Sequence, residues 1–358
     1  MPFNYNRIVI KIGSNVLTQS DGLPDVKRIG HLVEQIAAIK KQGKEVILVS
    51  SGAVASGRSL ITISEKYDAV ATRQLLASIG QVKLINTYAQ LFEQYKILCS
   101  QVLVTKEDFR DRMHYLNMKN CLGLLLQHDV IPVVNENDVV SVTELMFTDN
   151  DELAGLIASM MNAQALIILT NVNGIYNGNP LLDTTTVIKE INGETIDFSS
   201  FISSGKSQFG RGGMITKSNM AQKIAALGIA VHIANGTKDN ILNDVLENKV
   251  EHTRFIPNKT ASGKKKWLAH AENYATGVVQ INDGAKTALT SHKAVSLLPV
   301  GLVDILSEFK KGDIIKLVDE GDKLVGLGIA EYSADKAKEK IGQKNQKPLV
   351  HYDYLYLQ

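Results

Sequence analysis

The 358-residue sequence contains few of the residues that mark disulfide, metal or membrane proteins. Its two cysteines, Cys99 and Cys121, both lie in apolar segments, so we expect reduced cysteines in the protein interior. CxxC and HExxH motifs are absent and the eight histidines are scattered, which argues against a metal site built from protein ligands. No apolar run approaches the roughly 18 residues of a membrane span, and the N-terminal residues lack a signal-peptide pattern. We therefore expect a cytoplasmic protein with no membrane partner.

A strong excess of either charge is also absent. The net charge of +2 gives no general argument for binding nucleic acid or a membrane surface. The hydrophobic content of 44% is ordinary for a globular protein, and the length allows about two domains. No Ser/His/Asp or Cys/His arrangement indicates nucleophilic catalysis.

Strand-like and helix-like segments alternate over the first two-thirds of the chain. Because the strand candidates are apolar throughout and are each followed by a polar or glycine turn, we predict an α/β fold with a mostly parallel sheet sandwiched by helices. The expected strands are 7–12, 45–49, 100–104, 130–134, 165–169 and 230–233. The expected helices are 29–40, 73–95, 116–128 and 217–227, with Gly80 as a candidate break in the second.

The composition changes after about residue 250. A segment with Pro257, Gly263 and three consecutive lysines reads as a linker. Shorter β-like segments follow, separated by glycine and Asp/Asn turns, at 277–281, 314–318 and 324–329. We therefore predict a domain at 1–253, a linker at 254–266 and a small β-rich domain at 267–358.

Two clusters of acidic and amide side chains lie close together in the sequence. Residues 135–138 follow an expected strand, and residues 149–152 precede an expected helix. Carboxylates can bind an ammonium group and amides can bind a carboxylate. Either cluster alone is also an ordinary polar turn. Together they favour a site for a small charged ligand, and parallel sheets place such sites at the carboxyl ends of their strands.

Two lysines and a glycine-rich loop supply positive charge. The loop at 209–217 runs into a helix, so its backbone N–H groups could approach phosphate oxygens, although many such loops only make a turn. Lys11 interrupts an apolar strand, either as a phosphate ligand or as an edge-strand lysine facing solvent. A carboxylate nucleophile, ionised at neutral pH, needs no histidine base. These residues favour a phosphotransferase acting on a small polar metabolite.

Longer segments of the chain resemble the amino acid kinase family. The resemblance rests on VIKIGSNVLT (9–18), VSSGAVASGR (49–58), RQLLASIGQ (73–81), IPVVNENDVV (131–140), FTDNDELAGLIA (147–158), LTNVNGIY (169–176) and FGRGGMITK (209–217). The C-terminal segments KKWLAH (265–270), INDGAKTAL (281–289) and SLLPVG (296–301) resemble a PUA domain, which has a small β-barrel fold.

The combination is most similar to family members that transfer the γ-phosphate of ATP to the side-chain carboxylate of L-glutamate. That likeness implies the first step of proline synthesis, inhibition by proline, a homo-oligomer and a functional link to a γ-glutamyl phosphate reductase.

The resemblance also implies a role for individual residues. Lys11 and Lys217 would stabilise the transferring phosphoryl group, and Asp151 would hold both lysines. The residues implied to bind glutamate are Ser51, Gly52, Asn135, Asp138 and Asn150. The residues implied to bind ATP are Lys11, Gly13, Ser14, Thr170, Asn171, Arg211, Gly212, Gly213, Met214, Ile215, Thr216 and Lys217. Mg²⁺ would arrive with ATP, held by phosphate oxygens rather than by a protein ligand.

Three residues depart from the family pattern. Asn171 stands where Asp is usual, Arg211 where Thr is common, and Thr148 where Gly is usual. Two alternatives stay open. One is a kinase of the same fold for aspartate, N-acetylglutamate or carbamate. The other is RNA binding by the C-terminal domain, which its lysines favour and its accompanying acidic residues oppose.

Overall fold

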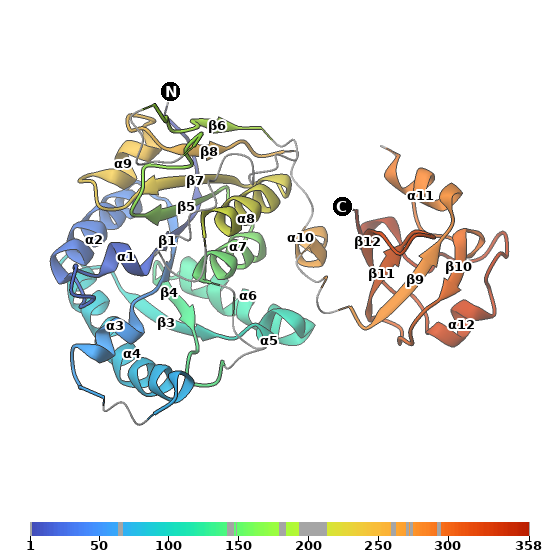
Figure 1. The fold of residues 1–358 in the computed structure, drawn as a ribbon, viewed down its shortest axis with the longest axis horizontal. Coiled ribbons are helices and arrows are strands. Elements are labelled where there is room, and N and C mark those ends of the chain that lie inside the picture. Colours follow the sequence, from blue (N-terminus) through green and yellow to red (C-terminus); the bar gives the residue numbers. More distant parts are fainter. Residues whose placement is uncertain are drawn as a thin grey trace. The chain divides into compact units, whose positions relative to one another are not determined.

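A computed structural model describes most of the chain. The described residues are 2–63, 67–141, 147, 149–178, 184–192, 213–258, 263–269, 272, 275–291 and 295–357. They divide into two compact units, Met1–Thr260 and Ala261–Gln358. Each unit has its own sheet and its own hydrophobic core (Figure 1).

The larger unit is built on an eight-stranded sheet with the order β3-β4-β2-β1-β5-β7-β8-β6. Its strands are β1 (Arg7–Ile12), β2 (Glu45–Ser50), β3 (Cys99–Val104), β4 (Ile131–Glu136), β5 (Ala165–Thr170), β6 (Glu190–Ile191), β7 (Ala230–Asn235) and β8 (Thr253–Phe255). The β7–β8 pairing is antiparallel and the other pairings are parallel. The predicted mostly parallel sheet is confirmed, and each long strand lies within two residues of its expected bounds.

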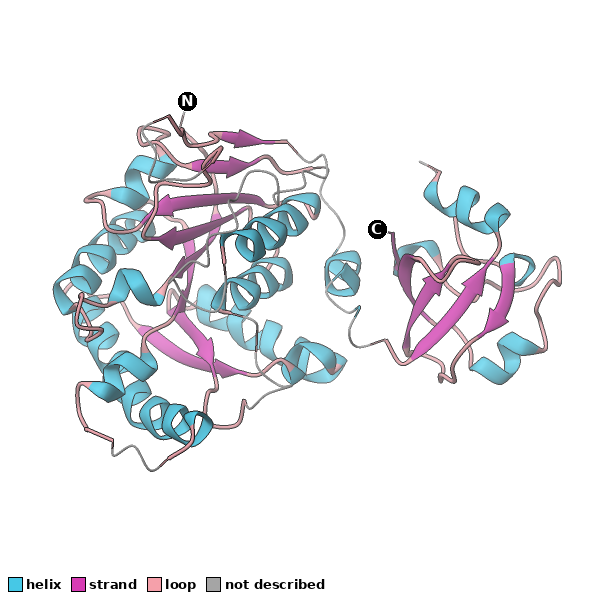
Figure 2. Cartoon of the chain, viewed as in Figure 1, coloured by secondary structure: helices cyan, strands magenta, loops and turns pink. Residues whose placement is uncertain are grey.

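Helices cover both faces of this sheet (Figure 2). They are α1 (Ser14–Leu17), α2 (Val26–Lys41), α3 (Ala53–Arg58), α4 (Ala69–Glu93), α5 (Glu107–Arg110), α6 (Arg112–Gln127), α7 (Asn150–Met160), α8 (Met214–Ala226) and α9 (Ile241–Leu246). Helices α2, α4 and α9 pack their apolar side chains on one face. Helix α7 packs on β1 and α8 on β7, with α6 against β4, on the other face.

The alternation of side chains along β1 decides where Lys11 points. Ile8, Ile10 and Ile12 belong to the apolar cluster shared with α2 and α4. Because successive side chains of a strand point to opposite faces, Lys11 points to the other face, on which α7 packs. Strand β1 lies between β2 and β5, so the edge-strand interpretation of Lys11 is wrong.

Helices α3 and α4 approach each other closely through two glycines. A Cβ atom on Gly80 would lie 1.9 Å from the Ala53 carbonyl oxygen, and one on Gly57 would lie 2.1 Å from that of Leu76. Gly80 therefore does not break the helix expected at 73–95, since α4 is continuous. It is glycine because the backbone of α3 occupies the space of a side chain.

A buried hydrogen-bonded group of Tyr5, His232 and His252 lies where β7 pairs with β8. His252 Nδ1 donates to the Val250 carbonyl (2.9 Å), so a neutral His252 accepts at Nε2 from His232 Nδ1 (3.0 Å). His232 Nε2 then accepts from the Tyr5 hydroxyl (3.1 Å). Burial lowers the pKa of both histidines, that of His232 strongly. Burial therefore favours the neutral form of both histidines in the folded protein.

The smaller unit contains a five-stranded sheet with the order β10-β9-β11-β12-β13. Its strands are β9 (Gly277–Ile281), β10 (Leu302–Ile305), β11 (Ile314–Val318), β12 (Leu324–Ile329) and β13 (Leu355–Leu357). Its helices are α10 (Gly263–Ala269), α11 (Asp283–Thr290), α12 (Ala334–Lys338) and the 3₁₀ turns η4 (Pro299–Gly301) and η5 (Tyr352–Tyr354). The expected small β-rich domain is confirmed, and its sheet has a core of its own.

Two local differences from the sequence analysis have simple causes. Cys99 is half-buried and Cys121 is exposed, so Cys121 is not the interior residue that its apolar neighbours indicated. It lies on the outer side of the helix whose Leu122 and Leu126 face the core. Residues 254 and 255, expected in a linker, belong to β8 because that strand adds to the large sheet. The domain bounds themselves stay a prediction.

Within the described ranges, no helix combines the length and apolarity needed to span a membrane.

Candidate active site

Two lysines from distant segments converge on one buried carboxylate. Lys11 comes from the centre of the sheet and Asp151 from the first turn of α7. Lys11 Nζ lies 2.6 Å from Asp151 Oδ1, and Lys217 Nζ binds Asp151 Oδ2. Asp151 is only 1% exposed and Lys11 6%. We call these three residues the lysine cluster, and their formal charge is +1.

The charge of Asp151 depends on its two partners. Burial by itself would raise the pKa of this carboxyl, but the ammonium groups of Lys11 and Lys217 outweigh burial and hold the pKa below its ordinary value. The carboxylate therefore stays ionised. In turn it fixes both ammonium groups in position at the end of β1.

Asp149, two residues before Asp151, prepares this geometry. Its Oδ1 accepts the backbone N–H groups of Asp151 (2.9 Å) and Glu152 (3.1 Å), so it is the N-cap of α7. Burial and the neighbouring Asp151 raise the pKa of Asp149. Its Oδ2 is buried and has no hydrogen-bond partner among the described residues. The cap therefore fixes the first turn of α7, which carries Asp151.

A network of amides lies beside the lysine cluster at the ends of β2 and β4. Asn150 Nδ2 donates to Ser51 Oγ (2.9 Å) and to Asn135 Oδ1 (3.0 Å). Asn135 Nδ2 donates to Gln81 Oε1 (2.9 Å), which reaches in from α4. Gly52, with φ +108°, makes the turn from Ser51 into α3. We call Ser51, Gln81, Asn135 and Asn150 the amide network.

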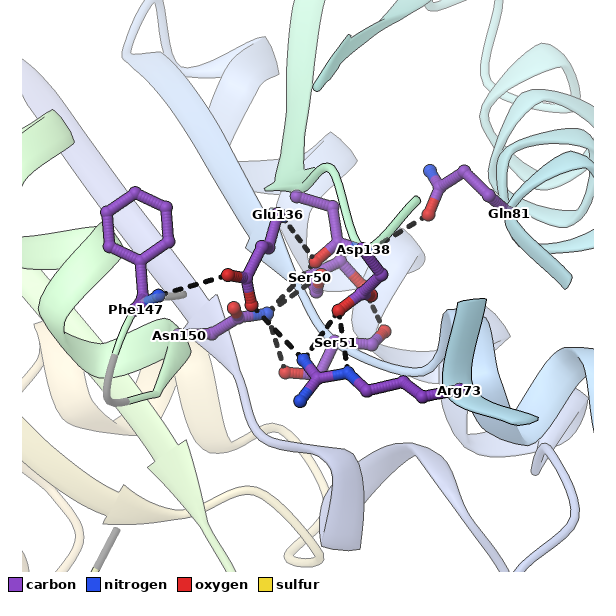
Figure 3. Close-up of polar contacts among 9 residues, drawn as sticks. Ser50, Ser51, Arg73, Gln81, Glu136, Asp138, Phe147 and Asn150 are labelled. Atoms are coloured by element: carbon purple, nitrogen blue, oxygen red, sulfur yellow. Dashed lines mark hydrogen bonds and ion pairs between the residues drawn. The ribbon is translucent and has the colours of Figure 1, made fainter. Parts of the chain in front are cut away.

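Arg73 joins two carboxylates at the other side of this network (Figure 3). Its Nε lies 2.9 Å from Asp138 Oδ1, to which its Nη2 also binds, and Nη2 lies 3.2 Å from Glu136 Oε2. Glu136 Oε1 accepts the backbone N–H of Phe147 (3.0 Å). Burial raises the pKa of Glu136, and Asp138 adds to this while Arg73 opposes it. We call Arg73, Glu136 and Asp138 the arginine cluster, with a formal charge of −1.

The turns after β1 and β5 form the other side of the site. The Gly13 N–H donates to the Leu169 carbonyl (3.1 Å), which holds the turn leading into Ser14 beside Thr170. A Cβ on Gly13 would lie 3.5 Å from Lys11 Nζ, so this backbone is close to the lysine cluster. Asn171 follows Thr170, whose hydroxyl donates to it (3.3 Å).

The start of α8 supplies Lys217 from within its first turn. Gly213 is the N-cap, and Met214, Ile215 and Thr216 follow it before Lys217. The helix N-terminus has unpaired N–H groups and a favourable dipole for an anion. Arg211, Gly212 and Thr148 lie outside the described residues.

The strand order divides the site into two halves. The amide network and arginine cluster arise at β2 and β4, whereas Gly13 and Thr170 arise at β1 and β5. The lysine cluster lies between these halves, because Lys11 is on β1. The strands β2 and β4 lie on one side of β1 in the sheet, and β5 and β7 lie on the other. This is the switch point at which open α/β sheets bind ligands. The arrangement can hold an ammonium-bearing acid on one side and a polyphosphate on the other.

Sequence reasoning assigned no role to Arg73 and Gln81, which the structure brings to the site. Glu136 and Asp149 lie in the clusters 135–138 and 149–152 that were expected to form a ligand site, but neither received an individual role. Arg73 and Gln81 are separated by eight residues, which places them on one side of a helix. Leu76, Ala77 and Gly80 between them are buried, so polar residues on an apolar helix face were the available signal.

The chain is similar to known proteins over its full length. A sequence profile of the amino acid kinase family matches residues 6–235, and one of the PUA domain matches residues 277–352. A glutamate 5-kinase from Bacteroides thetaiotaomicron is 53% identical and covers 100% of both chains. A glutamate 5-kinase from Chlorobaculum tepidum is 50% identical, over 99% of this chain and 98% of its own.

One solved structure shares the fold of the larger unit. The carbamate kinase from Giardia lamblia bound to AMP-PNP aligns with a TM-score of 0.50 and 20% identity. The alignment covers 71% of this chain and 99% of that kinase. At this identity the likeness concerns the fold alone.

Proposed function

The chain belongs to the amino acid kinase family, and from this premise we propose that it transfers the γ-phosphate of ATP to the γ-carboxylate of L-glutamate. The product is γ-glutamyl phosphate, an acyl phosphate, and the enzyme is a phosphotransferase with a carboxyl group as acceptor. The observation that carries this proposal is the lysine cluster, with its excess positive charge, beside the amide network and the anionic arginine cluster, which suit an amino acid.

The reaction needs positioning and positive charge rather than a base. A carboxylate oxygen of glutamate attacks the γ-phosphorus, the bond from that phosphorus to the β-bridging oxygen breaks, and ADP leaves with the electron pair. No proton has to be removed, because the carboxylate is already ionised. Lys11 and Lys217 stabilise the charge on the transferring group, and Asp151 holds them.

The acceptor occupies the half of the site at β2 and β4. Asp138 binds the α-ammonium group, and Ser51, Gly52, Asn135 and Asn150 surround the α-carboxylate and side chain. The nucleotide occupies the other half, along Gly13, Ser14, Thr170 and Asn171 and the loop that enters α8. Mg²⁺ enters as part of the MgATP substrate and neutralises phosphate oxygens.

Hydroxylamine trapping of the acyl phosphate tests this function. With MgATP and L-glutamate the wild type should form γ-glutamyl hydroxamate. Lys217→Ala should lower kcat about 10³-fold, because removing one charge-stabilising donor costs about 10²–10³ in rate and this lysine is a full cation. Lys249→Ala is the matched control, because Lys249 is an exposed lysine that pairs with Glu247. Faster phosphorylation of aspartate, N-acetylglutamate or carbamate than of glutamate would refute the substrate assignment.

We also propose that the reaction begins proline synthesis in the cytoplasm and that proline inhibits it. Proline also carries an α-carboxylate and a positively charged α-nitrogen, although this nitrogen is a secondary ammonium in a ring, so the acceptor half can bind it in competition. The acyl phosphate hydrolyses readily, which favours rapid use by a γ-glutamyl phosphate reductase. A coupled assay with that reductase should show less hydrolysis than the two enzymes assayed in sequence.

A homo-oligomer is supported by the outer side of α6. Met113, Leu116 and Leu124 are 63%, 37% and 56% exposed, and β3 is the edge strand of the same half of the sheet. Exposed apolar groups of this kind mark protein contacts. Sedimentation should give a species larger than one chain, and Leu124→Lys should reduce it.

RNA binding is not proposed for the smaller unit. Lys286 pairs with Asp319 (2.7 Å) and Lys338 with Glu308, so the positive charge of these two lysines is locally compensated. Such pairing opposes the continuous basic surface that nucleic acid requires.

A further inference from the structure

Helix α4 touches the acceptor half of the site at three separate points. Arg73 binds Asp138 and Glu136, Gln81 binds Asn135, and Tyr88 shares a hydrogen bond with Ser50 (2.8 Å). We infer that Arg73 and Gln81 are positioning residues that set the affinity of the enzyme for its amino acid acceptor. The inference rests on the proposed function, because it names what those residues do for that substrate.

Arg73 places one cation between two neighbouring carboxylates and fixes the orientation of one. Asp138 and Glu136 are 9% and 4% exposed, so without a cation they would repel each other in a poorly hydrated space. Both contacts between Arg73 and Asp138 use Oδ1. Within the described part of the chain, Oδ2 of Asp138 is then the oxygen left to receive an ammonium group. The planar fork of the guanidinium determines which way this oxygen faces.

Gln74, the next residue of α4, also binds the segment that contains Asp138. Its Nε2 donates to the Val139 carbonyl (2.7 Å), directly after Asp138. Two consecutive residues of the helix therefore hold the segment that follows β4. The opposite end of the arginine cluster is held as well, since Glu136 accepts the Phe147 N–H just before α7. Arg73 thus connects α4 to both sides of the acceptor half.

Gln81 fixes the orientation of the amide network. Because Asn135 Nδ2 donates to Gln81 Oε1, Asn135 Oδ1 must face the Glu136 N–H (2.9 Å) and Asn150 Nδ2. Asn150 in turn presents its own carbonyl oxygen away from Asn135. Gln81 Nε2 is buried and unpartnered among the described residues, so a donor remains available beside the acceptor half.

The close packing of α3 on α4 makes these positions rigid. Gly80, directly before Gln81, has no room for a side chain against Ala53 of α3. Helix α3 begins immediately after Ser51 and Gly52. A rotation of α4 would therefore move the arginine cluster, the amide network and the Ser51 turn together. This coupling explains why a helix that touches no reacting atom can set acceptor affinity.

The test separates acceptor affinity from turnover. Arg73→Gln should raise KM for L-glutamate at least 10-fold and leave KM for ATP within about twofold, and Arg73→Lys should recover part of the loss. Arg7→Gln is the matched control. Arg7 pairs with Glu45 at the first residues of β1 and β2, whereas the site lies at the other end of these strands. Equal changes in both KM values, or an unchanged KM for glutamate, would overturn the inference.

A second variant guards against a folding defect at Arg73. Gln81→Met removes the oxygen that orients Asn135 and should also raise KM for glutamate without raising KM for ATP. Gln35→Met is its control, since Gln35 is equally buried and accepts the Leu242 N–H (2.8 Å) away from the site. If Gln81→Met behaves like Gln35→Met, the inference fails. A wild type that phosphorylates no glutamate would instead refute the proposed function.

Discussion

In the lysine cluster one carboxylate serves two cations, whereas in the arginine cluster one cation serves two carboxylates. Both are three-charge groups with buried carboxylates, and both sit at the same edge of one sheet. Their opposite excess charges suit opposite ligands, phosphate oxygens in the first and an ammonium group in the second. The ratio of cations to carboxylates in each cluster, rather than the mere presence of ion pairs, therefore decides what each half of the site can hold.

The two clusters also differ in what their central residue does. Asp151 lies between two cations that are expected to touch the phosphoryl group, so its removal disturbs both at once. Arg73 lies between two carboxylates, of which only Asp138 is expected to touch the acceptor. A defect in the lysine cluster should therefore appear in turnover, and a defect in the arginine cluster in acceptor affinity.

Asp151→Asn should have the largest effect, because it leaves two ammonium groups close together without a counter-charge. We expect kcat to fall about 10³-fold and the free energy of unfolding to fall by about 3–5 kcal/mol. Chemical denaturation and steady-state assays measure the two losses. Asp129→Asn, in an exposed pair with Lys40, should change stability by less than about 1 kcal/mol. Similar losses in both variants would show that the burial of Asp151 between two lysines has no special role.

Asp138→Asn should have an intermediate effect confined to the acceptor. Losing one charge-assisted contact to the α-ammonium group, worth about 1.5–3 kcal/mol, should raise KM for glutamate about 10–100-fold. The value of kcat and KM for ATP should change little, because the lysine cluster is intact. Initial rates with each substrate varied in turn measure this, and a fall in kcat with an unchanged KM would contradict the division of labour.

The histidine pair at β7 and β8 should have the smallest effect, and one independent of catalysis. Folding lowers the pKa of His232 and His252, so below about pH 6.5 the unfolded chain binds more protons than the folded one. The free energy of unfolding should therefore fall as the pH falls through this window, by up to about 1.4 kcal/mol per pH unit for each histidine. Urea titrations between pH 5 and 7.5 measure the slope.

His232→Gln should flatten this dependence, whereas His31→Gln, at an exposed position of α2, should not. An identical slope in all three proteins would assign the acid sensitivity to other groups. Unlike the two charged clusters, the histidine pair has no net charge, so it shows what a buried polar group contributes when no ligand depends on it.

Much of the fold was predictable because the strands are continuous apolar runs with clear turns. The sheet, its helices and the β-rich smaller unit follow from that pattern. The role of Gly80 was not predictable, because a glycine inside a helix signals either a break or a close approach, and only the position of α3 decides between them. The same limit applies to β8, a three-residue strand whose existence depends on pairing with β7.

For the site as well, some residues were predictable from local sequence and others depend on tertiary contacts. Lys11, Asp151 and Lys217 stand out locally or through family resemblance, and the structure places them in one cluster. Arg73 looks like an ordinary helix residue, since its partners lie 63 and 65 residues further along the chain. Such contacts arise from the packing of α4 beside β4, which no local pattern contains.

The Lys11–Asp151 pair has a consequence for how the protein is made. Asp151 follows Lys11 by 140 residues, and Lys217 follows Asp151 by a further 66. At a translation rate of about 5–20 residues per second, Asp151 is synthesised on the order of ten seconds after Lys11. Burying the Lys11 ammonium group without Asp151 would be costly, so β1 cannot pack into the sheet before Asp151 is available. The central strand, although synthesised first, is therefore expected to be among the last to reach its native surroundings.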